Sequence, residues 1–205
     1  MIAKVCGMTR LTDALHAAQH GATALGFVFW PRSPRYIDPW QAAAIIQELP
    51  DTVTAVGVFV NQPVDEIQRV VVTAGITAVQ LHGDEPAAYA GALGWPVWRA
   101  VALPHADTTL PAWPESTTFL LDAHDAILRG GTGKTINWQA AARVAAARRV
   151  ILAGGLTPEN VQDAIRTVRP EGVDVSSGVD QSPGVKDVDK VARFLERARA
   201  AFNAY

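Results

Sequence analysis

The sequence has a single cysteine, Cys6, and contains no cluster of cysteine and histidine residues with the spacing of a metal site. One cysteine excludes a disulfide within the chain, and no metal is expected. Apolar runs stay well short of the ~20 residues that span a bilayer, and the N-terminus lacks the pattern of a signal peptide. We therefore expect a protein without a membrane anchor, in a reducing compartment such as the cytoplasm.

The chain also lacks a large excess of charge of either sign. The chain has 18 basic and 20 acidic residues, a formal net charge of -2 and no run of lysine or arginine, so nucleic acid is not expected as a partner. A small anionic ligand remains compatible with this balance, because a helix N-terminus and one arginine suffice to bind it. With 205 residues, 49% of them hydrophobic, the chain is expected to form a single domain over residues 1–205.

What the sequence does have is a recurring apolar run of strand length. Most of these runs are nearly unbroken, which is typical of strands buried on both faces of a parallel sheet. The runs are Ile2–Cys6, Ala24–Phe29, Thr54–Val60, Ala78–Leu81, Val97–Leu103, Thr118–Asp122, Val150–Ala153 and Val173–Ser176.

Segments of helical periodicity lie between the runs. Asp38-Pro39 and Thr157-Pro158 each offer an N-cap followed by proline at the first helical position. Gly21 and Gly75 stand where helices are expected to end. The fifth unit is weak, because residues 104–114 contain too many prolines for an ordinary helix.

Eight strand-then-helix units predict a parallel sheet with right-handed crossovers. They close most simply into a (β/α)8 TIM barrel, for which about 200 residues is near the minimum. An open, doubly wound sheet is the alternative.

Two glycine- and serine-containing segments predict a phosphate site. Gly154-Gly155 precedes an expected helix start, and Ser176-Ser177-Gly178 follows the eighth strand. Backbone amides and a helix dipole attract an anion, and the loops after strands seven and eight are the usual phosphate site of a TIM barrel. Ordinary strand-to-helix turns are the alternative for either segment alone.

The segment Gly131-Thr132-Gly133-Lys134-Thr135 suggests a nucleotide-binding P-loop. That motif needs a further glycine at the position of Leu128. We interpret residues 130–135 instead as a glycine-rich loop that covers a ligand.

Cys6 and Asp122 are each the last residue of a predicted strand. A thiol and a carboxyl in these positions face one another across a parallel barrel, where they can serve as general base and general acid. Each residue also has a structural alternative. A lone strand cysteine is often a small buried hydrophobe, and an aspartate at a strand end often caps a turn.

Taken together, these segments resemble the phosphoribosylanthranilate isomerases, (β/α)8 enzymes of tryptophan biosynthesis. The resemblance runs nearly end to end. It is carried by KVCG at 4–7, GFVFWPRSPRYI at 26–37, GVFVN at 57–61, VQLHG at 79–83, LLD at 120–122, GGTGKT at 130–135, GGLTPENV at 154–161 and VDVSSGVDQSPGVKD at 173–187.

The resemblance implies an Amadori rearrangement of a small phosphorylated aminoaldose, without cofactor or metal. It assigns Cys6 as the base, Asp122 as the acid and Arg35 as the residue that holds the anthranilate carboxylate. His82 resembles a family histidine near the ligand, although a structural hydrogen bond is the alternative. Asp174, an acid within a buried strand, is expected to face a polar lumen or the ligand. A monomer or a homodimer is expected.

Two other functions stay open at this point. One is the related isomerase of histidine biosynthesis, which uses an aspartate where Cys6 stands and needs phosphate sites at both ends of its substrate. The other is a non-catalytic protein that binds phosphate or a nucleotide through residues 130–135.

Overall fold

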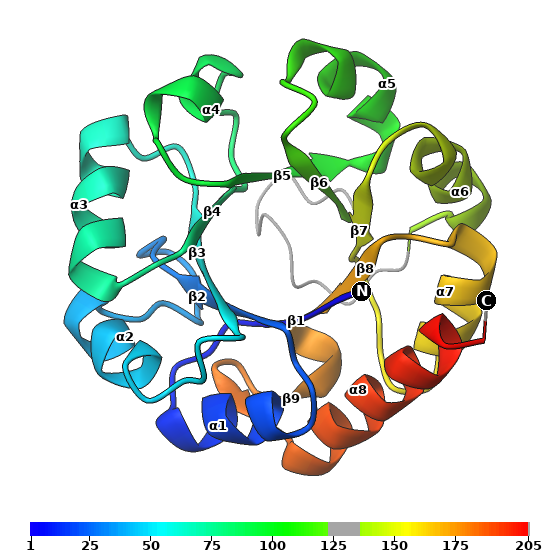
Figure 1. Cartoon of the computed structure of the whole chain (residues 1–205), viewed down its shortest axis with the longest axis horizontal. Helices are drawn as coiled ribbons and strands as arrows, with labels where there is room; N and C mark the ends of the chain where they lie inside the picture. The colour runs from blue at the N-terminus through cyan, green and yellow to red at the C-terminus, as the bar shows by residue number, and fades with distance from the viewer. Residues whose placement is uncertain (123–135, 205) are drawn as a thin grey trace.

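The computed structural model describes residues 1–122 and 136–204, and its central feature is a closed parallel barrel of eight strands (Figure 1). Each strand pairs with the next, and the last pairs with the first. The strands are β1 (Ile2–Cys6), β2 (Ala24–Val28), β3 (Thr54–Phe59), β4 (Ala78–Leu81), β5 (Val97–Ala102), β6 (Thr118–Asp122), β7 (Val150–Leu152) and β8 (Gly172–Val175). The predicted (β/α)8 barrel is confirmed, and the open doubly wound sheet is excluded.

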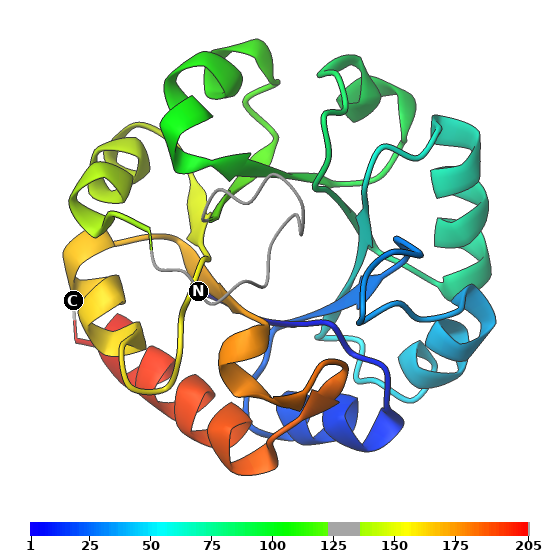
Figure 2. The same ribbon diagram turned by 180° about the vertical axis from the view of Figure 1, so that it is seen from behind.

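Helices surround the barrel on all sides, as Figures 1 and 2 show from opposite ends. They are α1 (Leu11–Gln19), α2 (Pro39–Ile46), α3 (Val64–Ala74), α4 (Ala88–Ala92), α5 (Ala106–Thr109), α6 (Trp138–Ala147), α7 (Val161–Val168) and α8 (Val188–Phe202). As expected, the proline-rich fifth unit forms no ordinary helix. It consists of α5 between the 3-10 turns η1 (Leu103–His105) and η2 (Leu110–Ala112). After β8 come a third 3-10 turn, η3 (Ser177–Val179), and a hairpin of β9 (Asp180–Ser182) and β10 (Val185–Lys186).

The helix ends follow the sequence with one correction. Asp38 caps α2 as predicted, accepting hydrogen bonds from the amides of Trp40 (2.9 Å) and Gln41 (3.4 Å). The helix expected directly after Thr157-Pro158 begins only at Val161. The side chain of Asn160 accepts the Thr157 amide (2.8 Å) and donates to the Gly155 carbonyl (2.9 Å). These bonds stabilise a turn where the proline pattern predicted the first helical residues.

Two apolar layers hold the barrel together. Between strands and helices lies a continuous core that includes Phe27, Phe59, Phe119 and Phe194. Inside the barrel, a second cluster extends from the amino-terminal ends of strands to Ala153, directly beyond β7; it contains Ala24, Val56, Ala78, Trp98, Ala100, Leu120, Ile151 and Ala153.

None of the helices in the described part of the chain combines the length and apolar character needed to cross a bilayer.

Candidate active site

Polar side chains occupy the barrel lumen above the apolar cluster. Successive residues of a strand point to opposite faces, so Lys4 and Cys6 of β1 share the inward face. On β4, Gln80 points inward, and so does His82 directly beyond the strand. With Asp122 of β6 and Asp174 of β8 they form a lumen that is polar toward the carboxyl ends of the strands.

The predicted site residues lie together around one cavity of about 260 Å³ at this end. All of them line it: Cys6, Arg35, His82, Asp122, Gly154, Gly155, Asp174, Ser176, Ser177 and Gly178. Strand ends more than 100 residues apart in the sequence thus converge on one hollow. Residues 130–135, predicted to cover it, lie outside the described residues.

Cys6 ends β1 at the wall of the cavity, with only 8% of its surface exposed. Burial raises the pKa of its thiol above the ordinary value. The Lys4 ammonium opposes this rise, while the Asp174 carboxylate adds to it. Proton removal from Cys6 therefore depends on the charges that surround the sulfur.

Asp122 belongs to a chain of three side chains. Its Oδ2 lies 3.4 Å from His82 Nε2, and His82 Nδ1 lies 3.1 Å from Gln80 Nε2. An amide nitrogen only donates, so Gln80 makes Nδ1 the acceptor and leaves the proton of a neutral His82 on Nε2, directed at Asp122. His82 thus contacts a side chain of β6 and a side chain of β4, and its place near the ligand stays a prediction.

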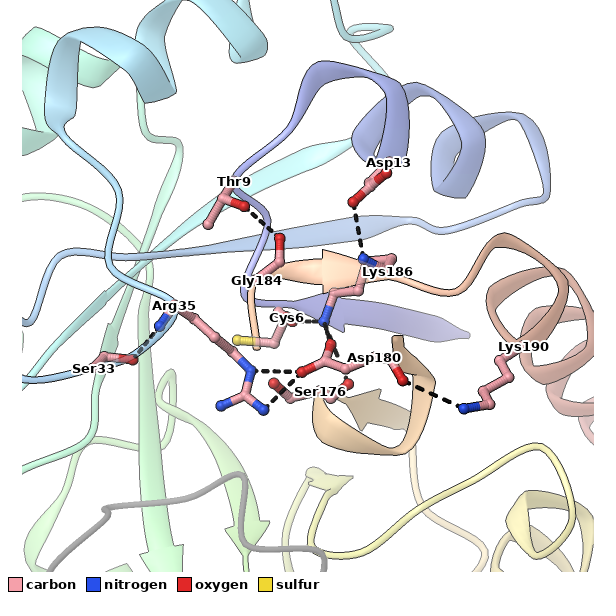
Figure 3. A network of polar contacts seen from close by, with 10 residues as sticks. All are labelled: Cys6, Thr9, Asp13, Ser33, Arg35, Ser176, Asp180, Gly184, Lys186 and Lys190. Atoms are coloured by element: carbon pink, nitrogen blue, oxygen red, sulfur yellow. Dashed lines mark hydrogen bonds and ion pairs between the residues drawn. The ribbon is translucent and has the colours of Figure 1, made fainter. Parts of the chain in front are cut away.

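Arg35 reaches the cavity from the loop after β2, and its guanidinium is held by Asp180. Arg35 Nε and Nη2 both donate to Asp180 Oδ2, at 2.9 and 2.7 Å. Figure 3 shows Arg35 and Lys186 meeting the Asp180 carboxylate from different directions beside Cys6. Lys186 Nζ also donates to the Cys6 carbonyl (2.6 Å). Burial lowers the pKa of Lys186, and the ion pair with Asp180 limits the fall.

The predicted phosphate segments lie against one another. Gly154 and Gly155 have φ angles of 81° and 66°, a conformation that favours glycine. A Cβ at Gly178 would lie 1.9 Å from the Leu156 carbonyl oxygen, so only glycine permits this approach of the two loops. Because α7 begins at Val161, residues of these two loops, rather than the first turn of the helix, line the cavity.

Sequence reasoning missed four polar residues of the site: Lys4, Gln80, Asp180 and Lys186. Lys4 Nζ binds Asp174 Oδ1 (2.9 Å) in the centre of the barrel. One signal was available for Lys4 and Gln80, since each lies on a strand two residues before a predicted site residue, Cys6 or His82, and so faces the same side.

The barrel and the residues at the carboxyl ends of its strands define a (β/α)8-barrel enzyme. Residues 3–197 match the family model of N-(5'phosphoribosyl)anthranilate (PRA) isomerase. The N-(5'-phosphoribosyl)anthranilate isomerase of Geobacter sp. strain M21 is 47% identical over 198 residues, which cover 96% of this chain and 97% of that one. The chain belongs to the phosphoribosylanthranilate isomerase family.

Solved structures agree with this assignment. The phosphoribosylanthranilate isomerase of Thermotoga maritima has a TM-score of 0.90 at 40% identity, over 98% of this chain and 100% of that one. A second isomerase structure is in complex with reduced 1-(o-carboxyphenylamino)-1-deoxyribulose 5-phosphate. It has a TM-score of 0.86 at 39% identity, over 98% of this chain and 100% of that one. The predicted family, the barrel and an isomerase of tryptophan biosynthesis are confirmed, which favours the first of the three functions that the sequence left open.

Proposed function

We propose that Cys6 and Asp122 are the general base and general acid with which this isomerase rearranges N-(5'-phosphoribosyl)anthranilate to 1-(2-carboxyphenylamino)-1-deoxyribulose 5-phosphate. One observation carries the proposal. A thiol from β1 and a carboxyl from β6 line the same cavity, together with Arg35 and with the loops after β7 and β8. The relative that binds the reduced product analogue supports this substrate class.

The reaction needs two proton transfers. Asp122 donates a proton to the furanose ring oxygen, the bond between that oxygen and C1 breaks, and the nitrogen lone pair forms an iminium. The Cys6 thiolate then removes the C2 proton, and the electrons of that bond move to give an enolamine. Tautomerisation of the enolamine yields the ketone. Well-placed acid and base groups each contribute roughly 100- to 10,000-fold to such steps.

The remaining residues hold the substrate and the catalytic groups. Arg35 grips the anthranilate carboxylate, for which a guanidinium offers parallel hydrogen bonds. Gly154, Gly155, Ser176, Ser177 and Gly178 hold the phosphate through amides and hydroxyls. His82 keeps its Nε2 proton directed at Asp122. Asp174 faces the lumen near the Asp122 carboxyl and the Cys6 thiol. The proposal includes no cofactor and no metal. We propose that the enzyme acts as a monomer or homodimer in the cytoplasm, where the Cys6 thiol stays reduced.

Replacing each catalytic group tests the proposal. Cys6→Ser and Asp122→Asn are each expected to lower kcat at least 100-fold, in a fluorescence assay that follows loss of phosphoribosyl anthranilate, with unchanged circular dichroism. Asp163→Asn serves as the matched control, because Asp163 lies on the outer surface of α7. Turnover close to that of the control in either variant removes that residue from the mechanism.

A further inference from the structure

Lys4 is a lysine with no exposed surface in the middle of the barrel. Transferring an ammonium group from water to a protein interior is costly unless the charge is paired. The partner is Asp174 of the neighbouring strand β8, whose Oδ1 lies 2.9 Å from Lys4 Nζ. Such a pair is seldom retained for stability alone, which raises the question of what the ammonium group does at this position.

The ammonium group lies beneath the sulfur of Cys6. The two residues stand two positions apart on β1, so their side chains extend from the same face. A Cβ placed on Gly26, which lies opposite Cys6 on β2, would be 2.6 Å from Cys6 Sγ and 3.1 Å from Lys4 Nζ. The absent side chain of Gly26 thus provides the space in which the sulfur and the ammonium group approach one another.

The other charged groups around Cys6 have other partners. Lys186 of β10 is paired with Asp180 and bound to backbone carbonyls, and Arg35 is paired with the same Asp180. From β6 and the end of β4, Asp122 and His82 contact each other. Asp174 of β8 is the carboxylate that holds Lys4 among residues 1–122 and 136–204.

Lys4 remains charged in this environment. Burial lowers its pKa, but attraction to Asp174 and Cys6 outweighs burial, so that the pKa lies above the ordinary value. Among the influences that lower the pKa of Cys6, the Lys4 charge is the strongest. A thiolate formed at Cys6 therefore has a permanent cation at its side.

We propose that the Lys4 ammonium is the counter-ion of the Cys6 thiolate, a positioning residue held beneath the sulfur by Asp174. An opposite charge at this range favours the ionised form of a thiol by about one to three pH units. The consequence for turnover rests on the proposed role of Cys6 as the base, whereas the effect on thiol ionisation does not.

The single cysteine permits a direct test. The rate of alkylation by iodoacetamide, measured on the folded protein by mass spectrometry across pH, reports the ionisation of Cys6 alone. Lys4→Met is expected to move the inflection upward by about one pH unit or more. Asp174→Asn is expected to move it downward, because the repulsion between two anions disappears while the amide oxygen still accepts the hydrogen bond from Lys4. Lys4→Arg keeps the cation and is expected to restore most of the shift.

Arg69→Met is the control for loss of a positive charge, since Arg69 lies on α3 with its side chain 74% exposed and is expected to leave the inflection unchanged. Should Lys4→Met fail to fold because Asp174 is left unpaired, the double variant Lys4→Met with Asp174→Asn removes both charges. Its inflection is then compared with that of Asp174→Asn and is expected to lie about one pH unit or more higher.

The outcomes separate this inference from the proposed function. An inflection unchanged by loss of Lys4, in either background, overturns the counter-ion role whatever the activity. A shift in alkylation that is matched by the acid limb of the kcat/KM profile supports both. A shift in alkylation without any shift in that profile supports the counter-ion role and contradicts Cys6 as the base.

Discussion

Removing one partner of the ion pair between Arg99 and Glu85 is expected to destabilise the protein strongly, because the other charge is then left buried. Arg99 Nη1 lies 2.6 Å from Glu85 Oε2, and Nη2 donates to the Gly83 carbonyl (2.9 Å). Glu85 also accepts the amides of Asn61 (2.7 Å) and Gly83 (2.9 Å). One carboxylate thus joins the segments that follow β3 and β4 to a side chain of β5.

Arg99→Met removes the cation and leaves Glu85 buried, bound by the two amides just named within the described part of the chain. Breaking a buried pair from one side costs about 3–5 kcal/mol, a large share of the roughly 5–15 kcal/mol that stabilises a domain. For a chain of this length, we expect Tm to fall by roughly 10 °C. Urea unfolding followed by circular dichroism measures the loss.

The exposed pair Arg69–Asp65 provides the matched control. Its atoms lie 3.4 Å apart on α3, with side chains 74% and 76% exposed. Arg69→Met is expected to cost no more than about 0.5 kcal/mol, because water screens such pairs. Adding Glu85→Gln to Arg99→Met should recover part of the loss, since no unpaired charge then remains. A loss for Arg99→Met no larger than that for Arg69→Met would refute this reasoning.

Three further predictions concern the site. Arg35→Lys is expected to raise KM about tenfold or more while kcat changes little, because an ammonium group cannot reproduce the parallel hydrogen bonds of the guanidinium; steady-state kinetics measure this, and an unchanged KM contradicts the carboxylate role. Gly178→Ala pushes a Cβ against the Leu156 carbonyl, so protection of the protein against thermal unfolding by inorganic phosphate should weaken. Because burial raises the pKa of Cys6 above the 9.0 of a free thiol, the folded state keeps its proton longer than the unfolded chain. The free energy of unfolding should then fall by up to about 1.4 kcal/mol per pH unit above pH 9. Urea titrations of the Cys6→Ser variant should lack this contribution, and an equal fall in the variant would contradict the prediction.

The fold was predictable because each strand corresponds to a short apolar run in the sequence. Unbroken apolar runs placed all eight strands to within one residue at each end, since strands buried on both faces tolerate almost no polar residue. The start of α7 was not predictable in the same way. Thr157-Pro158 carries a helix-start pattern, but the Asn160 side chain stabilises a turn before the helix begins. The sequence pattern alone does not show whether the helix or the turn is more stable at these residues.

The site was predictable where its residues end strands. Cys6 and Asp122 stand at such ends and line the cavity, and the resemblance supplied the roles that we propose for them. Asp180 and Lys186 were missed because their importance arises from a contact between the β9–β10 hairpin and Arg35, across 145 residues of sequence. No local pattern records a partner at that distance.

Lys4 was missed for a related reason, and its place in the topology gives it a particular meaning. Lys4 and Asp174 are opposed in the register of β1 and β8, the two strands whose pairing closes the barrel. Their ion pair can form only when the first strand and the last have met. Asp174 holds Lys4 at the sulfur only in that closed state, so the proposed counter-ion of the Cys6 thiolate is fixed in place by the same pairing that completes the fold.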